Sequence, residues 1–158
     1  MRRVLVGVLL AALSIAVAAA AAALPIWPLV SDEPYYSLYP NGSLVVVNGV
    51  IEPRTGAMWP YFYNATAILV FLFFASFIAS FFVEMGEAVR AFFAVISIAI
   101  AVFHYLSLVT MTNSLALYPL IYTITLKYHG NTIQQYYLDI GQIFIIYSIY
   151  NIWKLLEK

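Results

Sequence analysis

The sequence predicts an all-α integral membrane protein, a four-transmembrane-helix bundle with a small extracytoplasmic β-hairpin or sheet cap formed by its two outer loops. Two observations predict this fold. Residues 55–83 contain no charged side chain, and about 20 apolar helical residues cross a bilayer core about 30 Å thick. The chain is also 65% hydrophobic and only 9% charged, which excludes a soluble domain of this size.

The 158 residues form one membrane domain with four spans joined by three connections. The predicted order is a first span at about residues 4–28, an outer loop at 31–60, a second span at 61–83, an inner turn at 84–90, a third span at 91–114, a second outer loop at 115–133, a fourth span at 134–153 and an inner tail at 154–158. The first span has an alternative interpretation. A basic start followed by an alanine-rich run also fits a cleavable signal peptide covering residues 1–23.

The two outer loops carry the signals for β structure. Asn48 and Gly49 separate two β-branched runs, a pattern typical of a two-residue hairpin turn. We expect strands at 44–47 and 50–52, and further strands in the second outer loop. A lone hairpin is marginal in water, so we expect the two outer segments to fold together into one sheet.

The basic residues predict the orientation in the membrane. The residues expected on the inner side are Arg2, Arg3, Arg90, Lys154 and Lys158, and those expected on the outer side are Arg54 and Lys127. An excess of Lys and Arg marks the cytoplasmic side of a span. The sequence therefore predicts a multi-pass protein of the cell membrane with both termini in the cytoplasm.

Composition argues against several kinds of chemistry. The formal net charge is zero, so we expect no nucleic-acid partner. The absence of cysteine excludes disulfides and thiolate metal sites. Because His129 is expected in a loop, far from His104, we expect no metal site, and no motif indicates a cofactor.

Three polar residues are expected within the spans. His104 lies midway along the third span, where an ionisable side chain is a candidate functional residue, and Ser97 and Ser107 share its helical face. Asp139 and Gln142 share a face of the fourth span, with Asp139 about 8 Å inside the membrane boundary. Two structural alternatives compete: His104 only joins helices by hydrogen bonds, and Asp139 sits among the lipid headgroups.

The outer loops are rich in aromatic residues that suit an interaction surface. The candidate residues are Tyr35, Tyr36, Tyr39, Trp59, Tyr128 and Tyr136. Asn41 and Asn64 match the glycosylation acceptor pattern. Small residues four apart, such as Gly7 with Ala11 and Ala75 with Ala79, predict close contact between helices.

Four spans, a long first outer loop with β structure and a shorter second one are similar in topology to claudins and their four-span relatives. Claudins pair the tryptophans of their first loop with two cysteines, and here no cysteine accompanies Trp27 and Trp59. The likeness is therefore architectural, and no family residue is transferred.

Scarce chemical groups and abundant outer tyrosines predict a non-enzymatic function. We expect an accessory or structural subunit, or a surface interaction protein, whose partners besides the lipid bilayer are another membrane protein or further copies of this chain. The alternative is a transporter or channel component that uses His104 and Asp139. A membrane enzyme is the third hypothesis.

Overall fold

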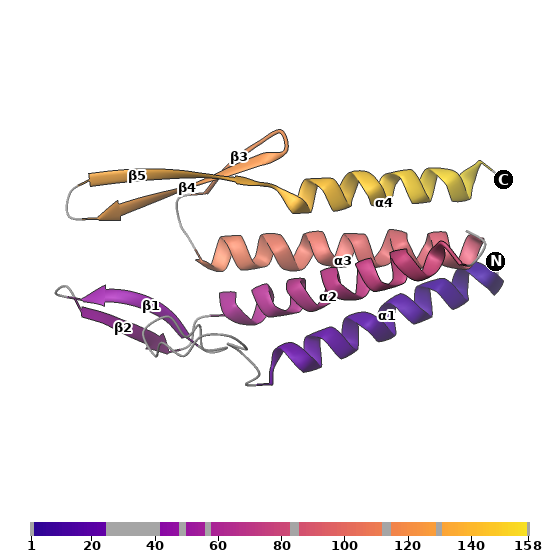
Figure 1. Ribbon diagram of the computed structural model, residues 1–158, viewed down its shortest axis with the longest axis horizontal. Helices are drawn as coiled ribbons and strands as arrows, with labels where there is room; N and C mark the ends of the chain where they lie inside the picture. The colour runs from indigo at the N-terminus through magenta and orange to yellow at the C-terminus, as the bar shows by residue number, and fades with distance from the viewer. Residues whose placement is uncertain are drawn as a thin grey trace.

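The computed structural model describes residues 2–24, 42–47, 50–55, 58–82, 86–111, 115–128 and 131–157, and these are mostly helical (Figure 1). The helices are α1 (Arg2–Ala22), α2 (Trp59–Ser80), α3 (Glu87–Met111) and α4 (Ile140–Leu156). The strands are β1 (Gly42–Val47), β2 (Val50–Thr55), β3 (Leu115–Tyr118), β4 (Ile121–Tyr128) and β5 (Asn131–Leu138).

Three of the helices are long and apolar enough to span a membrane: α1, the Tyr61–Ser80 part of α2 and the Glu87–Thr110 part of α3. α4 is shorter, with 17 residues. Large apolar side chains are exposed on all four helices, among them Leu5, Phe71, Ile98 and Ile146. A water-soluble bundle would turn such side chains inward, so the helix surfaces suit a lipid environment.

The four helices lie side by side, with α3 in contact with each of the others. α2 and α3 are antiparallel neighbours, as the short connection between them predicts. Both chain termini lie at one end of the bundle, which we call the terminal end (Figure 1). At the opposite end, the sheet end, β1, β2 and most of β4 and β5 extend beyond the helices, while β3 and its turn to β4 lie level with the last turns of α3 (Figure 1).

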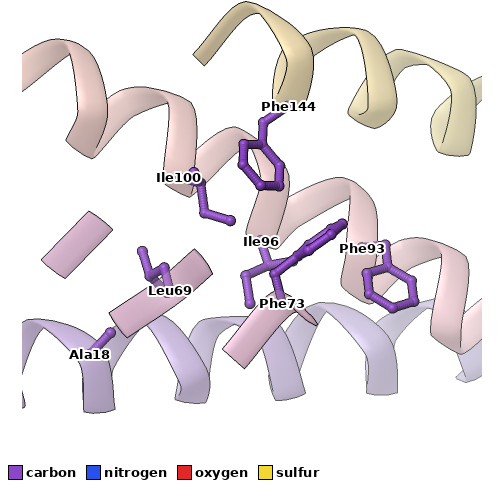
Figure 2. Packing of buried hydrophobic residues seen from close by; sticks show 7 residues of the cluster. All are labelled: Ala18, Leu69, Phe73, Phe93, Ile96, Ile100 and Phe144. Atoms are coloured by element: carbon purple, nitrogen blue, oxygen red, sulfur yellow. The ribbon is translucent and has the colours of Figure 1, made fainter. Parts of the chain in front are cut away.

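Aromatic rings from three helices meet in the core (Figure 2). The ring of Phe73 on α2 lies 4.9 Å from that of Phe144 on α4 and 5.2 Å from that of Phe93 on α3, both edge to face. Ile96 and Ile100 of α3 are fully buried beside them. Phe73 thus links α2 to α4 across α3, in the geometry that aromatic pairs prefer.

α1 joins the bundle through small residues. Gly7, Ala11, Ala18 and Ala22 form its buried face, which includes the predicted pair Gly7 and Ala11. A Cβ atom added to Gly7 would lie 2.1 Å from the carbonyl oxygen of Ala88. The backbones of α1 and α3 therefore touch at this point, and only glycine permits it.

The prediction of one sheet from the two outer segments is wrong. β1 pairs with β2 in a two-stranded sheet, and β3, β4 and β5 form a separate three-stranded antiparallel sheet. The sequence interpretation missed β3. β3 and β5 pair with the two sides of β4, so the segment from Leu115 to Leu138 forms its three-stranded sheet without the β1–β2 hairpin.

The predicted start of the fourth span is also wrong. Residues 134–138 belong to β5, and α4 begins only at Ile140. The earlier start came from requiring about 20 residues for a span. In the structure Asp139 is the N-cap of α4, and the chain changes from strand to helix at this residue.

Candidate functional site

Polar side chains from α3 and from the start of α4 meet at the sheet end of the bundle. His104 and Tyr105 come from α3, and Asp139 and Gln142 from the first turn of α4. We call these four residues the His–Asp cluster. Three of them are the candidates expected from sequence, and the fold brings those three together.

Asp139 is fully buried, with 0% of its surface exposed. Its carboxylate accepts hydrogen bonds from the Tyr105 hydroxyl, at 3.1 and 3.0 Å to its two oxygens, and from the Gln142 backbone N–H at 3.1 Å and side-chain Nε2 at 2.8 Å. An acceptor at this position caps the helix, and its negative charge interacts favourably with the positive end of the helix dipole. Asp139 is thus enclosed by donors from α3 and α4 at the point where α4 begins.

His104 approaches Asp139 without bonding to it. Its Nε2 lies 3.6 Å from Asp139 Oδ1, beyond hydrogen-bond length. That nitrogen is buried and has no hydrogen-bond partner within the described residues. A Cβ atom on Gly141 would lie 2.9 Å from both the His104 and the Tyr105 rings, so glycine at this position lets α4 pack against the two side chains.

Gln142 connects the cluster to the neighbouring sheet. Its Nε2 donates to the Tyr118 carbonyl at 2.7 Å, and its Oε1 accepts from the Leu120 backbone N–H at 2.9 Å. The Asp139 N–H donates to the Leu120 carbonyl at 2.9 Å. These bonds hold the turn between β3 and β4, where Leu120 has a positive φ of 61°.

A second group of buried polar side chains lies farther along the interface between α3 and α4. Ser148 Oγ donates to the Ala94 carbonyl at 2.9 Å, and Asn151 Nδ2 donates to the Tyr147 carbonyl at 2.9 Å. Ser97 Oγ and Asn151 Oδ1 are buried without a partner in the described part of the chain. Ser97, His104 and Ser107 are all buried, as their shared helical face predicts.

An apolar layer separates the two polar groups. Ser97 and His104 are seven positions apart on α3, a rise of about 10 Å. The buried side chains in this interval are Ile100 and Ala101, with Phe144 on α4 packed against the same core. A continuous chain of hydrogen-bonding groups therefore does not run along the interface between α3 and α4 in the described residues.

The chemistry available to the cluster is proton exchange and hydrogen bonding. His104 Nε2 and Asp139 Oδ1 lie 3.6 Å apart, so a direct proton transfer between them would require the two side chains to move into hydrogen-bond distance. Tyr105 supplies a hydroxyl donor to the carboxylate. Within the described residues, no three His, Cys, Asp or Glu side chains gather closely enough to hold a metal ion.

The three-stranded sheet presents two different surfaces. On one, the Tyr122 ring stacks on Tyr137 at 5.2 Å and approaches His104 at 5.8 Å. Burial raises the pKa of Tyr122 above 10, with Tyr137 adding to the shift, so this hydroxyl stays neutral at physiological pH. The side chains of the opposite surface alternate with these along the strands. Thr123 among them is buried, and four large hydrophobic side chains are exposed. We call these four the tyrosine face, made of Tyr118, Ile121, Tyr136 and Leu138.

The remaining candidates have different surroundings. Trp59 is partly exposed at the start of α2, with its ring 6.5 Å from that of Tyr63. Tyr128 is the last residue of β4. Asn64 is only 8% exposed within α2. Tyr35, Tyr36, Tyr39 and Asn41 lie outside the described residues.

Sequence analysis missed two members of this region. Tyr105, the principal donor to Asp139 from α3, was passed over because one tyrosine among thirteen carries no distinguishing signal. Asn151, fully buried on α4, was also missed. The position of Asp139 did have a signal: an Asp followed three residues later by Gln, before an apolar run, is typical of a helix start.

Comparisons with known proteins give no further guide to the site. No protein-family model, curated protein or solved structure matches the chain. The functional argument therefore depends on the chain's own residues, of which the His–Asp cluster and the tyrosine face are the two candidates.

Proposed function

We propose that this chain is a four-span integral protein of the cell membrane whose tyrosine face binds another protein. It would act as an accessory or structural subunit of a membrane assembly, or as a surface interaction protein. The observation that carries this proposal is the exposure of Tyr118, Ile121, Tyr136 and Leu138 on one surface of the sheet.

Several features of α4 support its being the fourth span. It lies alongside α3 (Figure 1) and exposes Ile146 and Ile149. Its 17 residues are about 25 Å long, slightly less than the bilayer core, a mismatch that local thinning of the bilayer accommodates. The excess of Lys and Arg at the terminal end supports cytoplasmic termini.

The tyrosine face is continuous across three strands. Register pairs Tyr118 with Ile121 and Ile121 with Leu138, while Tyr136 lies two residues along β5. Tyr136 is 68% exposed. Protein interfaces favour tyrosine because it combines a large apolar ring with a hydroxyl that can bond to a partner.

Purification in mild detergent with and without a change in this face tests the proposal. We expect a protein that copurifies with the unmodified chain to be lost from Tyr136→Ser. Tyr150→Ser is the control, because Tyr150 is also exposed but lies on α4 toward the other end of the bundle. A single homogeneous species without a second protein, unchanged by Tyr136→Ser, would contradict the proposal.

The contact between His104 and Asp139 favours a second candidate, a component that moves protons. A buried histidine beside a carboxylate is a typical element of proton relays in membranes. The apolar layer of Ile100, Ala101 and Phe144 argues against a continuous path through α3 and α4. In proteoliposomes, a proton flux abolished by both His104→Leu and Asp139→Asn would make this candidate the better one. We expect no such flux.

A further inference from the structure

An apolar groove of about 290 Å³ opens between three helices at the terminal end of the bundle. Its walls are formed by Leu10 of α1, by Ala79 and Ser80 near the end of α2, and by Ala88 and Phe92 near the start of α3. The Ser80 hydroxyl donates to the Phe77 carbonyl at 2.6 Å. Its hydrogen bond is therefore already made, and a ligand in the groove needs no polar group to bind it.

The packing of α1 explains why the groove exists. At the terminal end, α1 lies directly against α3 through Gly7 and Ala88. Toward the sheet end, α1 is joined to α2 instead, through the Tyr61 hydroxyl and the Ala19 carbonyl at 3.1 Å. This arrangement leaves a space between α1 and α2, with α3 as its third wall. The small side chains of Ala79 and Ser80 on α2 do not fill it.

The size and chemistry of the groove fit a hydrocarbon chain. An apolar cavity of about 150 Å³ holds a benzene molecule and stays free of water, so 290 Å³ accommodates a segment of acyl chain. The groove lies among helices whose outer surfaces are apolar and exposed. In a bilayer, the molecules that reach such an opening from the side are lipids.

A basic residue lies where the headgroup of such a lipid would be. Arg3 precedes Leu10 by seven residues, which places both on the same face of α1 with a rise of about 10 Å between them. Arg3 is exposed, and within the described residues its guanidinium has no ion-pair partner. Arg2 lies about 100° away around the helix.

From these observations we propose that the groove binds an acyl chain of an anionic phospholipid of the leaflet at the terminal end, with the phosphate against Arg3. Basic residues at the ends of membrane helices recognise anionic headgroups in this way. The site uses neither the His–Asp cluster nor the tyrosine face. It rests on the proposed membrane location of the chain but not on the proposed protein partner.

Native mass spectrometry of the full chain tests the inference. The chain is released from detergent that contains equal amounts of phosphatidylglycerol and phosphatidylcholine with identical acyl chains. We expect phosphatidylglycerol to be retained preferentially. Ala79→Phe, which fills the groove, should abolish retention, whereas Ala75→Phe should not. Ala75 is exposed one turn earlier on α2 and is not part of the groove wall.

Variants of Arg3 and Arg2 test the contact with the headgroup separately from the contact with the acyl chain. Arg3→Gln should reduce the preference for phosphatidylglycerol about fivefold, and Arg2→Gln, with the same loss of charge, should reduce it less. Equal retention of the two lipids by the unmodified chain would overturn the inference, as would equal effects of Ala75→Phe and Ala79→Phe. A lipid-free dimer that Ala79→Phe dissociates would also overturn it, because a second copy would then occupy the groove.

Discussion

The carboxylate of Asp139 is stabilised by three kinds of donor at once. Tyr105 donates from α3, while the Gln142 backbone and side chain donate from the first turn of α4. Burying a charge without such partners would be very costly. The same bonds fix where α4 begins, so one side chain joins α3, α4 and, through Gln142, the turn of the sheet.

We expect Asp139→Leu to lower the free energy of unfolding by about 2–4 kcal/mol, because it removes the helix cap and leaves buried donors unpaired. Asp139→Asn keeps an acceptor at the cap and should cost less. Denaturation in mixed micelles containing sodium dodecyl sulfate measures both. Equal stability of Asp139→Leu and the unmodified chain would mean that the carboxylate does not hold these elements together.

Sequence reasoning recognised His104, Asp139 and Gln142 but could not predict their contact. Their pairing depends on the register of α3 against α4, which Gly141 sets by allowing the His104 and Tyr105 rings to approach. A periodic pattern identifies the buried face of a helix but does not give the register between two helices. Tyr105 was missed for the same reason, since only this register brings it to Asp139.

Leu120 is held in a conformation that leucine disfavours. Its φ of 61° is the one positive value among the non-glycine residues that the structure describes. We expect Leu120→Gly to raise the free energy of unfolding by up to about 1 kcal/mol, as glycine adopts this conformation without steric cost.

The control for this change is Leu117→Gly in β3. Leu117 is also exposed but has ordinary strand geometry, and glycine there should lower stability by about 1 kcal/mol. The same micelle titration compares the two variants. Destabilisation of similar size by both would show that the turn carries no conformational strain.

At the scale of elements, two glycines mark where helices touch most closely, and they differ in what surrounds them. The atom nearest to a Cβ on Gly7 is the Ala88 backbone oxygen at 2.1 Å, whereas Gly141 faces the side chains of His104 and Tyr105 at 2.9 Å. A side chain can rotate to relieve a clash, but a helix backbone can only move as a whole.

We therefore expect Gly7→Ala to lower the free energy of unfolding by about 1–3 kcal/mol by separating α1 from α3. Gly141→Ala should cost less, because side-chain adjustment combines with the higher helix propensity of alanine. Crosslinking between cysteines introduced into α1 and α3 reports the separation directly. A larger effect at Gly141 than at Gly7 would contradict the close backbone contact.

The helices were more predictable from sequence than the sheets. Long uncharged runs locate α1, α2 and α3 because an apolar surface of membrane length is itself the signal. The Asn48-Gly49 sequence pattern correctly predicted the pairing of β1 with β2. The strand β3 was missed, because its turn is held by bonds from Gln142 that arise only in the folded chain. The strand-to-helix change at Asp139 was missed although Asp139 and Gln142 have the spacing typical of a helix start.

At the scale of the whole molecule, the proposal of four spans rather than three depends on which side of the membrane the C-terminus lies on. α4 begins beside the sheets and ends beside the N-terminus (Figure 1), so a bilayer around α1, α2 and α3 would also enclose α4. Since the chain has no cysteine, single introduced cysteines can report the side of each segment. The positions are Ser43→Cys in β1, Asn131→Cys in β5 and Glu157→Cys after α4.

We expect an impermeant thiol reagent added to intact cells to label Ser43→Cys and Asn131→Cys, and to label Glu157→Cys only after the membrane is opened. The excess of Lys and Arg at the terminal end predicts this direction. Labelling of Glu157→Cys together with Asn131→Cys in intact cells would show that α4 returns to the same side, and the four-span arrangement would be wrong. Reversed labelling of all three positions would keep the four spans and overturn the cytoplasmic placement of the termini, because it would turn the tyrosine face toward the cytoplasm.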